Sequence, residues 1–343
     1  MRGGSRTPPA SRARPPGRPT AARSSTRATT AARRSSTAFP RAAARAEAIG
    51  ARTVQVFADN PNAWARRKTP PAKLDEFRER LVALDIRPVA IHAAYLINLA
   101  GPDPAFRRSS IDVLASELRA APGYGASIVN VHIGSHRNTT AEAGISRIAA
   151  AVSEAFDAAG DASRHVRLSL ENSAGGGWTL GTDIPELVRI AEATARNGVP
   201  DARLGFCLDT AHAWGAGIAV DEPEVMDRWI ASFDAELGLR RLALIHLNDS
   251  RSERGSLQDR HEHVGAGRIG ERGLGHLLRH PALAEVPFIL ETPGMDIGYD
   301  EINLDRARRL VAGEPLPTLP PEAFTIPGSR TRGAAPPASS EDA

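Results

Sequence analysis

Short apolar runs rich in β-branched residues alternate with longer amphipathic stretches along most of the chain. Seven runs have the length and composition of buried strands: residues 53–57, 88–92, 128–132, 166–171, 204–209, 242–247 and 287–291. Helical periodicity fills the intervals, over residues 74–84, 111–121, 145–159, 184–195 and 224–237, and a helix over residues 40–49 precedes the first strand. Strict alternation favours a parallel sheet, and so many units favour a closed (β/α)8 TIM barrel.

A closed barrel of this kind needs eight strands, and the missing one would have to precede residue 40. Residues 1–39 are rich in Arg, Pro, Ser, Ala and Thr, with almost no large apolar side chains to bury. We therefore predict a disordered extension over residues 1–39 that packs poorly, and a first strand that is missing or replaced. The catalytic barrel is expected over residues 40–312, followed by a disordered Pro-rich tail over residues 313–343.

The basic extension has three interpretations. It resembles an organelle transit peptide, and it also resembles a basic arm that binds nucleic-acid phosphates. The third interpretation is translation out of frame, because Lys68 and Lys73 are the two lysines of the whole chain, a bias expected of GC-rich coding DNA. We favour the third interpretation, under which a damaged, non-catalytic product is one hypothesis for the chain.

Composition narrows the class of protein. No run of about 18 apolar residues and no apolar signal region occur, so we expect a soluble, cytoplasmic protein without a membrane span. Cys207 is the single cysteine, which excludes intramolecular disulfides and zinc sites built from several thiolates. Any metal site must therefore use His, Asp and Glu.

Charge is distributed unevenly. Residues 1–46 hold 11 of the 43 Lys and Arg residues and no Asp or Glu, so the rest of the chain carries 32 basic and 40 acidic residues. Net charge alone thus gives no nucleic-acid signature. Three zinc ions would bring the body of the chain close to neutral, which makes an acidic chain compatible with a polyanionic substrate.

Nearly every predicted strand ends in a side chain that can bind a metal: His92, His132, Glu171, Asp209, His246 and Glu291. Parallel strands converge on one mouth of a barrel, so these side chains should meet there. His212 lies just past a strand end, and Asp259 and His261 share one side of an extended loop. Any one of these residues is more often structural, but nine together suffice for about three ions. Five histidines favour zinc, with manganese as an alternative at one site.

Several sequence runs occur in the order found in a known family: VQVFADNPNAW (54–64), IHAAYLINLA (91–100), VHIGSH (131–136), LENSAGGG (170–177), CLDTAHAW (207–214), HLNDS (246–250), DRHEHVGAGRIG (259–270) and ILETP (289–293). On these runs the chain resembles the endonuclease IV family, of the xylose-isomerase-like TIM barrel superfamily, over about residues 47–312. The family usually opens with a short Gly-x-His-x-Ser strand, which this chain replaces with AARRSSTAFP at residues 31–40.

The resemblance implies a zinc-dependent apurinic/apyrimidinic endonuclease that cuts double-stranded DNA 5′ to abasic sites and leaves 3′-hydroxyl ends. It implies three ions: one on His92 and His132, a second on Asp209, His246 and Glu291, Glu171 bridging these two, and a third on His212, Asp259 and His261. Glu171 and Glu291 are then the catalytic residues, with Glu291 orienting or deprotonating the attacking water. Family precedent also implies a monomer.

Candidate DNA contacts are fewer. Tyr95 and Leu96 match the positions of the family that wedge into the base stack, and a hydrophobic loop anchor is an equally good interpretation. Asn62 stands where some members carry an intercalating arginine, and Arg66 and Arg67 are candidates to replace its phosphate contacts. His136, Arg260 and His263 are candidate phosphate contacts, with solvated loop histidines as the alternative for the first and last of these. Residues 175–177 are glycines that suggest close backbone approach or a flexible turn.

The alternative function on the same barrel is a xylose-isomerase-like sugar isomerase or epimerase. Such an enzyme needs a Glu, Asp, His, Glu set, which Glu171, Asp209, His246 and Glu291 satisfy. It does not need the remaining five metal-capable residues. Their completeness is why we favour the nuclease.

Overall fold

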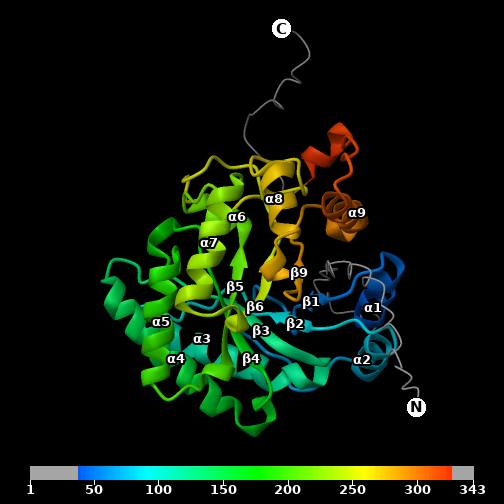
Figure 1. Ribbon diagram of the computed structural model, residues 1–343. Coiled ribbons are helices and arrows are strands. Elements are labelled where there is room, and N and C mark those ends of the chain that lie inside the picture. Colours follow the sequence, from blue (N-terminus) through cyan, green and yellow to red (C-terminus); the bar gives the residue numbers. More distant parts are fainter. Residues whose placement is uncertain (1–37, 327–343) are drawn as a thin grey trace, which may run out of the picture.

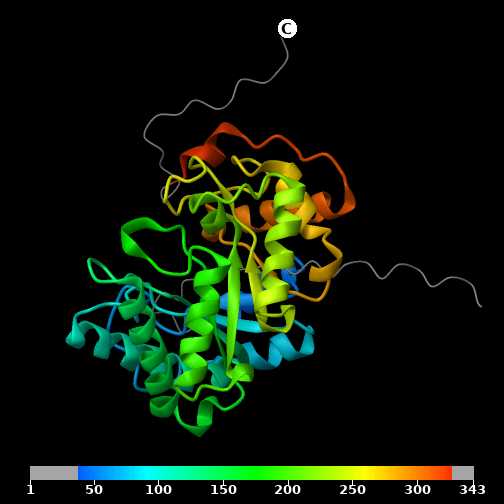
Figure 2. The same ribbon diagram turned by 60° about the vertical axis from the view of Figure 1, so that its left-hand side comes forward.

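A computed structural model describes residues 38–326, which form a nearly closed barrel of seven parallel strands surrounded by helices (Figures 1 and 2). The strands are β1 (Val54–Val56), β2 (Val89–His92), β3 (Ala126–His132), β4 (Arg167–Glu171), β5 (Leu204–Asp209), β6 (Leu242–His246) and β9 (Phe288–Ile289). They lie side by side in that order, and each pairs in parallel with the next. The predicted seven strands and the TIM-barrel class are confirmed.

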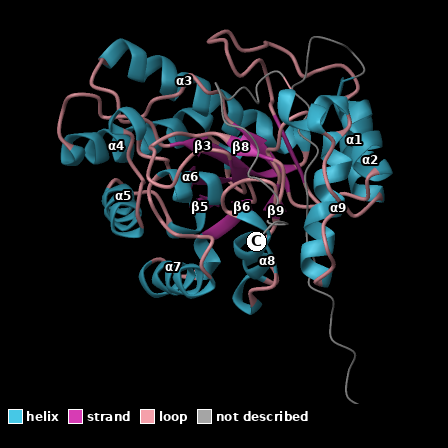
Figure 3. Cartoon of the chain, turned by 90° about the horizontal axis from the view of Figure 1, so that it is seen from above, coloured by secondary structure: helices cyan, strands magenta, loops and turns pink. Residues whose placement is uncertain are grey.

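The helices form the outer layer, as the view along the barrel shows (Figure 3). They are α1 (Ala38–Ala48), α2 (Leu74–Ala83), α3 (Pro104–Ala120), α4 (Ala141–Ala159), α5 (Ile184–Arg196), α7 (Pro223–Glu236), α8 (Gly270–Leu278) and α9 (Tyr299–Ala312). The short helix α6 (Thr210–Gly215) follows β5 directly and is buried, so it does not belong to the outer layer. Beyond the main sheet, β7 (Asp249–Ser250) and β8 (His261–Glu262) form an antiparallel pair. This pair carries the chain across the mouth of the barrel before it returns to β9.

Alternation along the strands separates two apolar layers. One large cluster joins the outward-facing strand residues to the helices. A second, small cluster consists of Ala90, Ile128, Cys207, Ala243, Leu244 and Ile289. Most of its members stand two or four positions before a polar residue at the end of the same strand, so they share its face. The barrel interior is therefore apolar at its base and becomes polar toward its mouth.

The sheet has two ends, β1 and β9, which no backbone ladder joins among residues 38–326. Helices α1 and α9 cover this place from outside, side by side in Figures 1 and 3. Arg45 of α1 binds Asp300 of α9 through Nε and Nη2, at 3.0 and 2.6 Å. Arg308 of α9 donates to the carbonyls of Ile49 and Gly50, at 3.2 and 2.6 Å. Side chains thus complete the ring where strand pairing is absent.

Element boundaries differ from the predicted ones where a helix cap was overlooked. Helix α3 begins seven residues before the predicted start, because Asp103 caps it by accepting from the N–H of Phe106 and Pro104 occupies its first turn. Helix α1 begins at Ala38, and Phe39 is buried against Phe77 and Tyr124, so the last two residues of the predicted extension belong to the barrel. Residues 1–37, where poor packing is predicted, lie outside the described part of the chain.

The described chain also continues past the boundary predicted at residue 312. Leu319, Ala323 and Ile326 are buried, and the carbonyl of Ala323 lies 3.0 Å from Nε2 of His263. The packed part of the chain therefore extends at least to Ile326. Within residues 38–326, no helix combines the length and apolar character needed to cross a lipid bilayer.

Candidate metal centre

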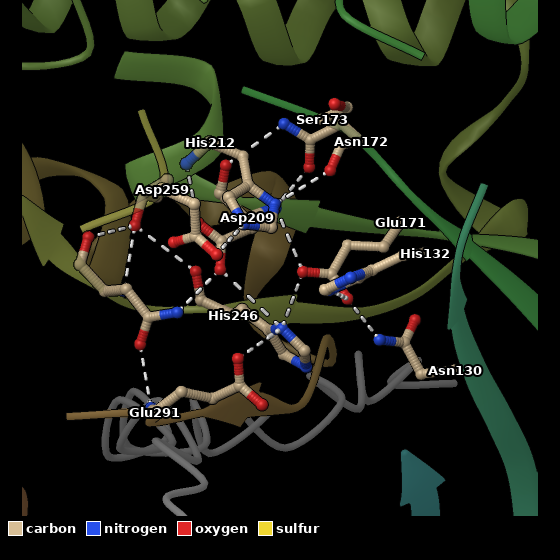
Figure 4. Close-up of polar contacts among 12 residues, drawn as sticks. Asn130, His132, Glu171, Asn172, Ser173, Asp209, His212, His246, Asp259 and Glu291 are labelled. Atoms are coloured by element: carbon tan, nitrogen blue, oxygen red, sulfur yellow. Dashed lines mark hydrogen bonds and ion pairs between the residues drawn. The ribbon is translucent and has the colours of Figure 1, made fainter. Parts of the chain in front are cut away.

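The polar residues at the strand ends meet at one mouth of the barrel (Figure 4). Register explains the meeting, because His132 pairs with Glu171 across β3 and β4, and Asp209 pairs with His246 across β5 and β6. Between these pairs the register is staggered by two residues, since His92 pairs with Asn130, Glu171 with Cys207 and His246 with Ile289. A stagger of two keeps each strand's last polar side chain on the inward face, so these side chains converge. Glu291, two residues past the end of β9, joins them.

Ligand-capable atoms form groups in which all lie within 4.8 Å of one another. The groups are His92, His132 and Glu171; Glu171, Asp209, His246 and Glu291; Asp209, His212 and His261; and Glu171, Cys207 and His246. Asp259 adjoins the third group, with its carboxylate 3.3 Å from His212 and 2.9 Å from His261. The structure thus brings together all nine residues that the sequence singled out.

Glu171 lies at the centre of the assembly. One carboxylate oxygen is 3.7 Å from Nε2 of both His92 and His132. The other is 3.2 Å from Nδ1 of His246 and of His212. This side chain is fully buried and faces two groups of ligands, which is the geometry required of a carboxylate that bridges two ions.

Four of the five histidines have a second ring nitrogen that faces an oxygen outside the centre. Those contacts are His92 Nδ1 with Ala93 O at 2.7 Å, His261 Nδ1 with Glu291 O at 2.7 Å, His212 Nδ1 with Asn172 O at 2.8 Å, and His246 Nε2 with Gln55 Oε1 at 3.2 Å. An acceptor on one nitrogen places the proton there and leaves the lone pair of the other nitrogen free for a cation.

Buried amides hold the carboxylates in the same way. Gln55 Nε2 donates to Glu291 Oε1 at 3.0 Å, Asn248 Nδ2 donates to Asp209 Oδ2 at 2.6 Å, and Asn130 Nδ2 donates to Glu171. Sequence reasoning missed these three residues. Asn130 and Asn248 stand two positions before and after a predicted ligand, so the period of two along a strand was the signal that points to them.

Burial and charge fit a set of cations. Burial lowers the pKa of His92 to about 4, so its ring is neutral and able to bind metal at pH 7. Burial opposes a charge on His212 too, yet Asp209 and Asp259 outweigh it and raise the pKa of that ring well above its usual value. The raised pKa shows that the clustered carboxylates stabilise positive charge at this place, which bound cations would supply. A centre of five imidazoles and four carboxylates is the donor chemistry of zinc.

Cys207 adjoins the centre and carries a thiol, unlike the imidazoles and carboxylates around it. Its side chain is fully buried and lies with Glu171 and His246, but burial raises the pKa of its thiol far above the ordinary range. A protonated thiol is a poor metal ligand, so Cys207 acts as an apolar member of the barrel interior.

The candidate DNA contacts differ in how exposed their side chains are. Tyr95 is half exposed and its ring centroid is 5.3 Å from that of His92 and 6.2 Å from that of His132. Leu96 and His136 are partly buried, whereas Asn62 and Arg260 are exposed. All five are placed so that a ligand at the surface can reach them, and their contacts with DNA stay a prediction.

Two further phosphate-contact predictions are wrong. His263 is completely buried, with its ring nitrogens bonded to Ala323 and Asn303, so it anchors the chain after α9. Arg66 turns its guanidinium inward onto Glu117 and three loop carbonyls. Arg67 is exposed and pairs with Asp59 at 3.4 Å. Sequence alone does not reveal which way such side chains turn, since their partners come from distant elements.

Comparison with known proteins agrees with this geometry. The model of the xylose isomerase-like TIM barrel family matches residues 43–313. The chain is 39% identical to a probable endonuclease 4 of Methanoculleus marisnigri over 270 residues, 79% of this chain and 94% of that protein. It is 39% identical to a probable endonuclease 4 of Solibacter usitatus over 276 residues, 80% of this chain and 93% of that protein.

Solved structures are similar over the same region. Endonuclease IV from Thermus thermophilus superposes with a TM-score of 0.72 at 34% identity, covering 85% of this chain and 99% of that one. A D-tagatose 3-epimerase-like protein superposes with a TM-score of 0.60 at 14% identity, covering 84% of this chain and 99% of that one. At so low an identity the second likeness concerns the fold alone.

Proposed function

The chain belongs to the endonuclease IV family of xylose isomerase-like TIM barrels, and from that membership we propose that it is a zinc-dependent endonuclease that hydrolyses the phosphodiester bond 5′ to abasic sites in double-stranded DNA. Family membership makes the chain a DNA-cleaving hydrolase. The abasic specificity, the position of the cut and the use of three zinc ions, with manganese as the alternative at one site, are our proposal. We also propose a monomer, because all nine residues of the centre come from one chain.

The observation that carries the proposal is the completeness of the centre around Glu171. A sugar isomerase of the same fold needs Glu171, Asp209, His246 and Glu291. It gives no role to the remaining five, which are His92, His132, His212, Asp259 and His261. Of these five, His92 and His132 face the other carboxylate oxygen of Glu171. The remaining three form a separate group, in which His212 comes from α6, Asp259 from the loop that leads into β8 and His261 from β8. Phosphodiester hydrolysis gives all nine a role.

When bound, divalent ions would lower the pKa of a water molecule and neutralise the charge that develops on the phosphate. The remaining work falls to side chains of the chain. Gln55 holds Oε1 of Glu291, while Oε2 faces the centre at 3.3 Å from Nδ1 of His246. We assign Glu291 the role of orienting the water and accepting its proton, and Glu171 the role of bridging the ligand groups and fixing the point of attack.

Bond changes are simple. The oxygen of the attacking water bonds to phosphorus, the bond from phosphorus to the 3′-oxygen breaks, and the phosphate stays on the 5′ carbon of the abasic sugar. The 3′-oxygen leaves as a hydroxyl by taking up a proton from solvent, which balances the proton that Glu291 accepts from the water. His132 is more exposed than the other ligands at the strand ends, so it marks the side from which a backbone can approach. The ring of Tyr95 lies beside His132. We assign it the role of entering the base stack of the duplex at the position of the missing base.

The test is cleavage of a labelled duplex with one synthetic abasic site, beside an intact duplex of the same sequence. We expect a cut 5′ to the abasic site, loss of cutting after prolonged chelation, and recovery on adding zinc. An intact metal-loaded protein that leaves the abasic duplex uncut but isomerises a ketose would instead support the sugar isomerase.

A further inference from the structure

Glu117 is a buried carboxyl group outside the metal centre. It lies on the inner face of α3 with a side chain that is 3% exposed. Burial raises the pKa of Glu117 to about 8, although Arg66 and the backbone N–H of Ala94 act in the opposite direction. Burying a carboxyl group lowers the stability of the fold unless hydrogen bonds or an ion pair compensate for the lost water. The catalytic mechanism makes no use of it.

Arg66 connects Glu117 to the loop of residues 59–67, which follows β1. Its Nη1 donates to Oε1 of Glu117 at 3.1 Å, and its other nitrogens donate to three carbonyls of the same loop, those of Asn60, Ala63 and Trp64. One guanidinium therefore determines the path of the loop and attaches it to α3. The planar donor set of arginine suits this task, because it leaves little rotational freedom.

The same loop supports Tyr95. The backbone N–H of Tyr95 donates to the carbonyl of Pro61 at 3.0 Å, and its ring packs edge-on against Phe57 with centroids 5.3 Å apart. Ala94, whose N–H acts on Glu117, is the residue before Tyr95. Glu117 thus contacts both the 59–67 loop, through Arg66, and the segment that carries Tyr95, through Ala94.

Part of the loop borders an open space instead of packed side chains. A cavity of about 360 Å³ lies between the loop and helices α2 and α3, lined among others by Asp59, Arg66, Lys68, Glu117 and Tyr124. Trp64 packs on Phe106 of α3 at the outer end of the loop, where both rings are more than a third exposed. The contact of Arg66 with Glu117 is therefore a buried side-chain attachment of the loop to α3.

We propose that Glu117 and Arg66 are positioning residues for DNA recognition, which hold the 59–67 loop, and Tyr95 with it, in the shape that receives the duplex. The proposal rests on the proposed endonuclease function. A loop ordered before binding does not lose conformational freedom when DNA arrives, so the pair strengthens binding without touching the reacting atoms.

The experiment compares Glu117→Leu, which removes the acceptor for Arg66, with Glu117→Gln, which keeps an acceptor oxygen. For cleavage of the abasic duplex we expect Glu117→Leu to raise KM about tenfold and leave kcat within twofold, with Glu117→Gln close to the wild type. Arg66→Met should raise KM as Glu117→Leu does, and the double variant should raise it no further, since both changes break one contact. Trypsin should cut faster after Arg67 and Lys68, which all the variants retain, in Glu117→Leu and Arg66→Met.

Glu154→Leu is the matched control, because Glu154 is an exposed carboxylate of α4 that pairs with Arg108 at 3.0 Å, and it should leave KM unchanged. Thermal unfolding identifies any variant that does not fold, and Arg66→Met then carries the test in its place. Unchanged KM in folded Glu117→Leu and Arg66→Met overturns the proposal, as does a fall in kcat equal to the rise in KM. A wild-type protein that does not cut abasic DNA overturns the proposed function itself.

Discussion

Gln55 of β1 donates a hydrogen bond from Nε2 to Oε1 of Glu291, at 3.0 Å, between the two ends of the sheet, which no ladder joins within residues 38–326. The same amide presents Oε1 to Nε2 of His246 at 3.2 Å. One neutral side chain thereby orients a candidate base and sets the tautomer of a candidate ligand. The contact also joins β1 to the segment after β9 at the mouth, where no ladder joins the strands.

The first prediction concerns Gln55→Leu. Without the amide, the proton on His246 is no longer held on Nε2 and Glu291 loses its donor, so the affinity of the ion beside them should fall about 10- to 100-fold. Competition with a chromogenic chelator measures the affinity without reference to catalysis. Asn197→Leu removes an exposed amide at the end of α5 and is the control. Equal zinc retention by Gln55→Leu and the control would contradict the prediction.

Glu291→Gln tests the assignment of the base. The amide is isosteric but accepts no proton, so kcat on the abasic duplex should fall by about 10²- to 10⁴-fold. The dissociation constant for the same duplex, measured by fluorescence anisotropy, should change little, because Tyr95 and the rim loops are untouched. A variant that keeps more than a tenth of the wild-type kcat would remove Glu291 from the mechanism.

The ionisation of Glu117 predicts how stability depends on pH. The pKa of this carboxyl group is about 8 in the folded protein against an ordinary value of 4.5, so the folded state binds the proton more tightly. Its contribution is fully present below pH 4.5 and is lost as the pH rises through 8. The free energy of unfolding of the wild type should therefore fall relative to Glu117→Gln between about pH 5 and 8, by up to about 1.4 kcal/mol per pH unit. Urea unfolding at several pH values measures it, and a constant difference would contradict it.

Removal of metal should destabilise the whole protein. Chelation leaves four carboxylates facing one another in a largely buried space, so we expect a drop of several degrees in Tm. Zinc should restore Tm, and magnesium should not, because magnesium prefers oxygen ligands and the centre offers five imidazoles. Full recovery with magnesium would refute the assignment of the donor set to zinc.

The candidate centre was largely predictable, because parallel strands carry their last residues to one mouth whatever the details of packing. His92, His132, Glu171 and Asp209 each end a strand, so a correct assignment of the strands already places them together. The spacing of Asp259 and His261 already marked them as candidate ligands on one side of a loop. Their grouping with His212 needed the resemblance to a family, since periodicity does not determine the path of that loop.

Other features depend on contacts between distant parts of the chain. His263 became a buried anchor because Asn303 and Ala323 close over it, and Arg66 turned inward because α3 offers Glu117. None of these three partners is close in sequence to the residue that it contacts. The start of α3 was predictable from Asp103 and Pro104, which form an ordinary helix cap, and the prediction failed by following apolar periodicity alone.

The contact of Arg45 with Asp300 spans 255 positions of the sequence. During synthesis, α1 and β1 therefore leave the ribosome long before the helix that covers them exists. Within residues 38–326 the outer edge of β1 has no ladder partner, and such an edge is a template for pairing with another chain until α9 covers it. Helix α9 thus covers α1 and β1, and these contacts can form only after most of the chain has been synthesised.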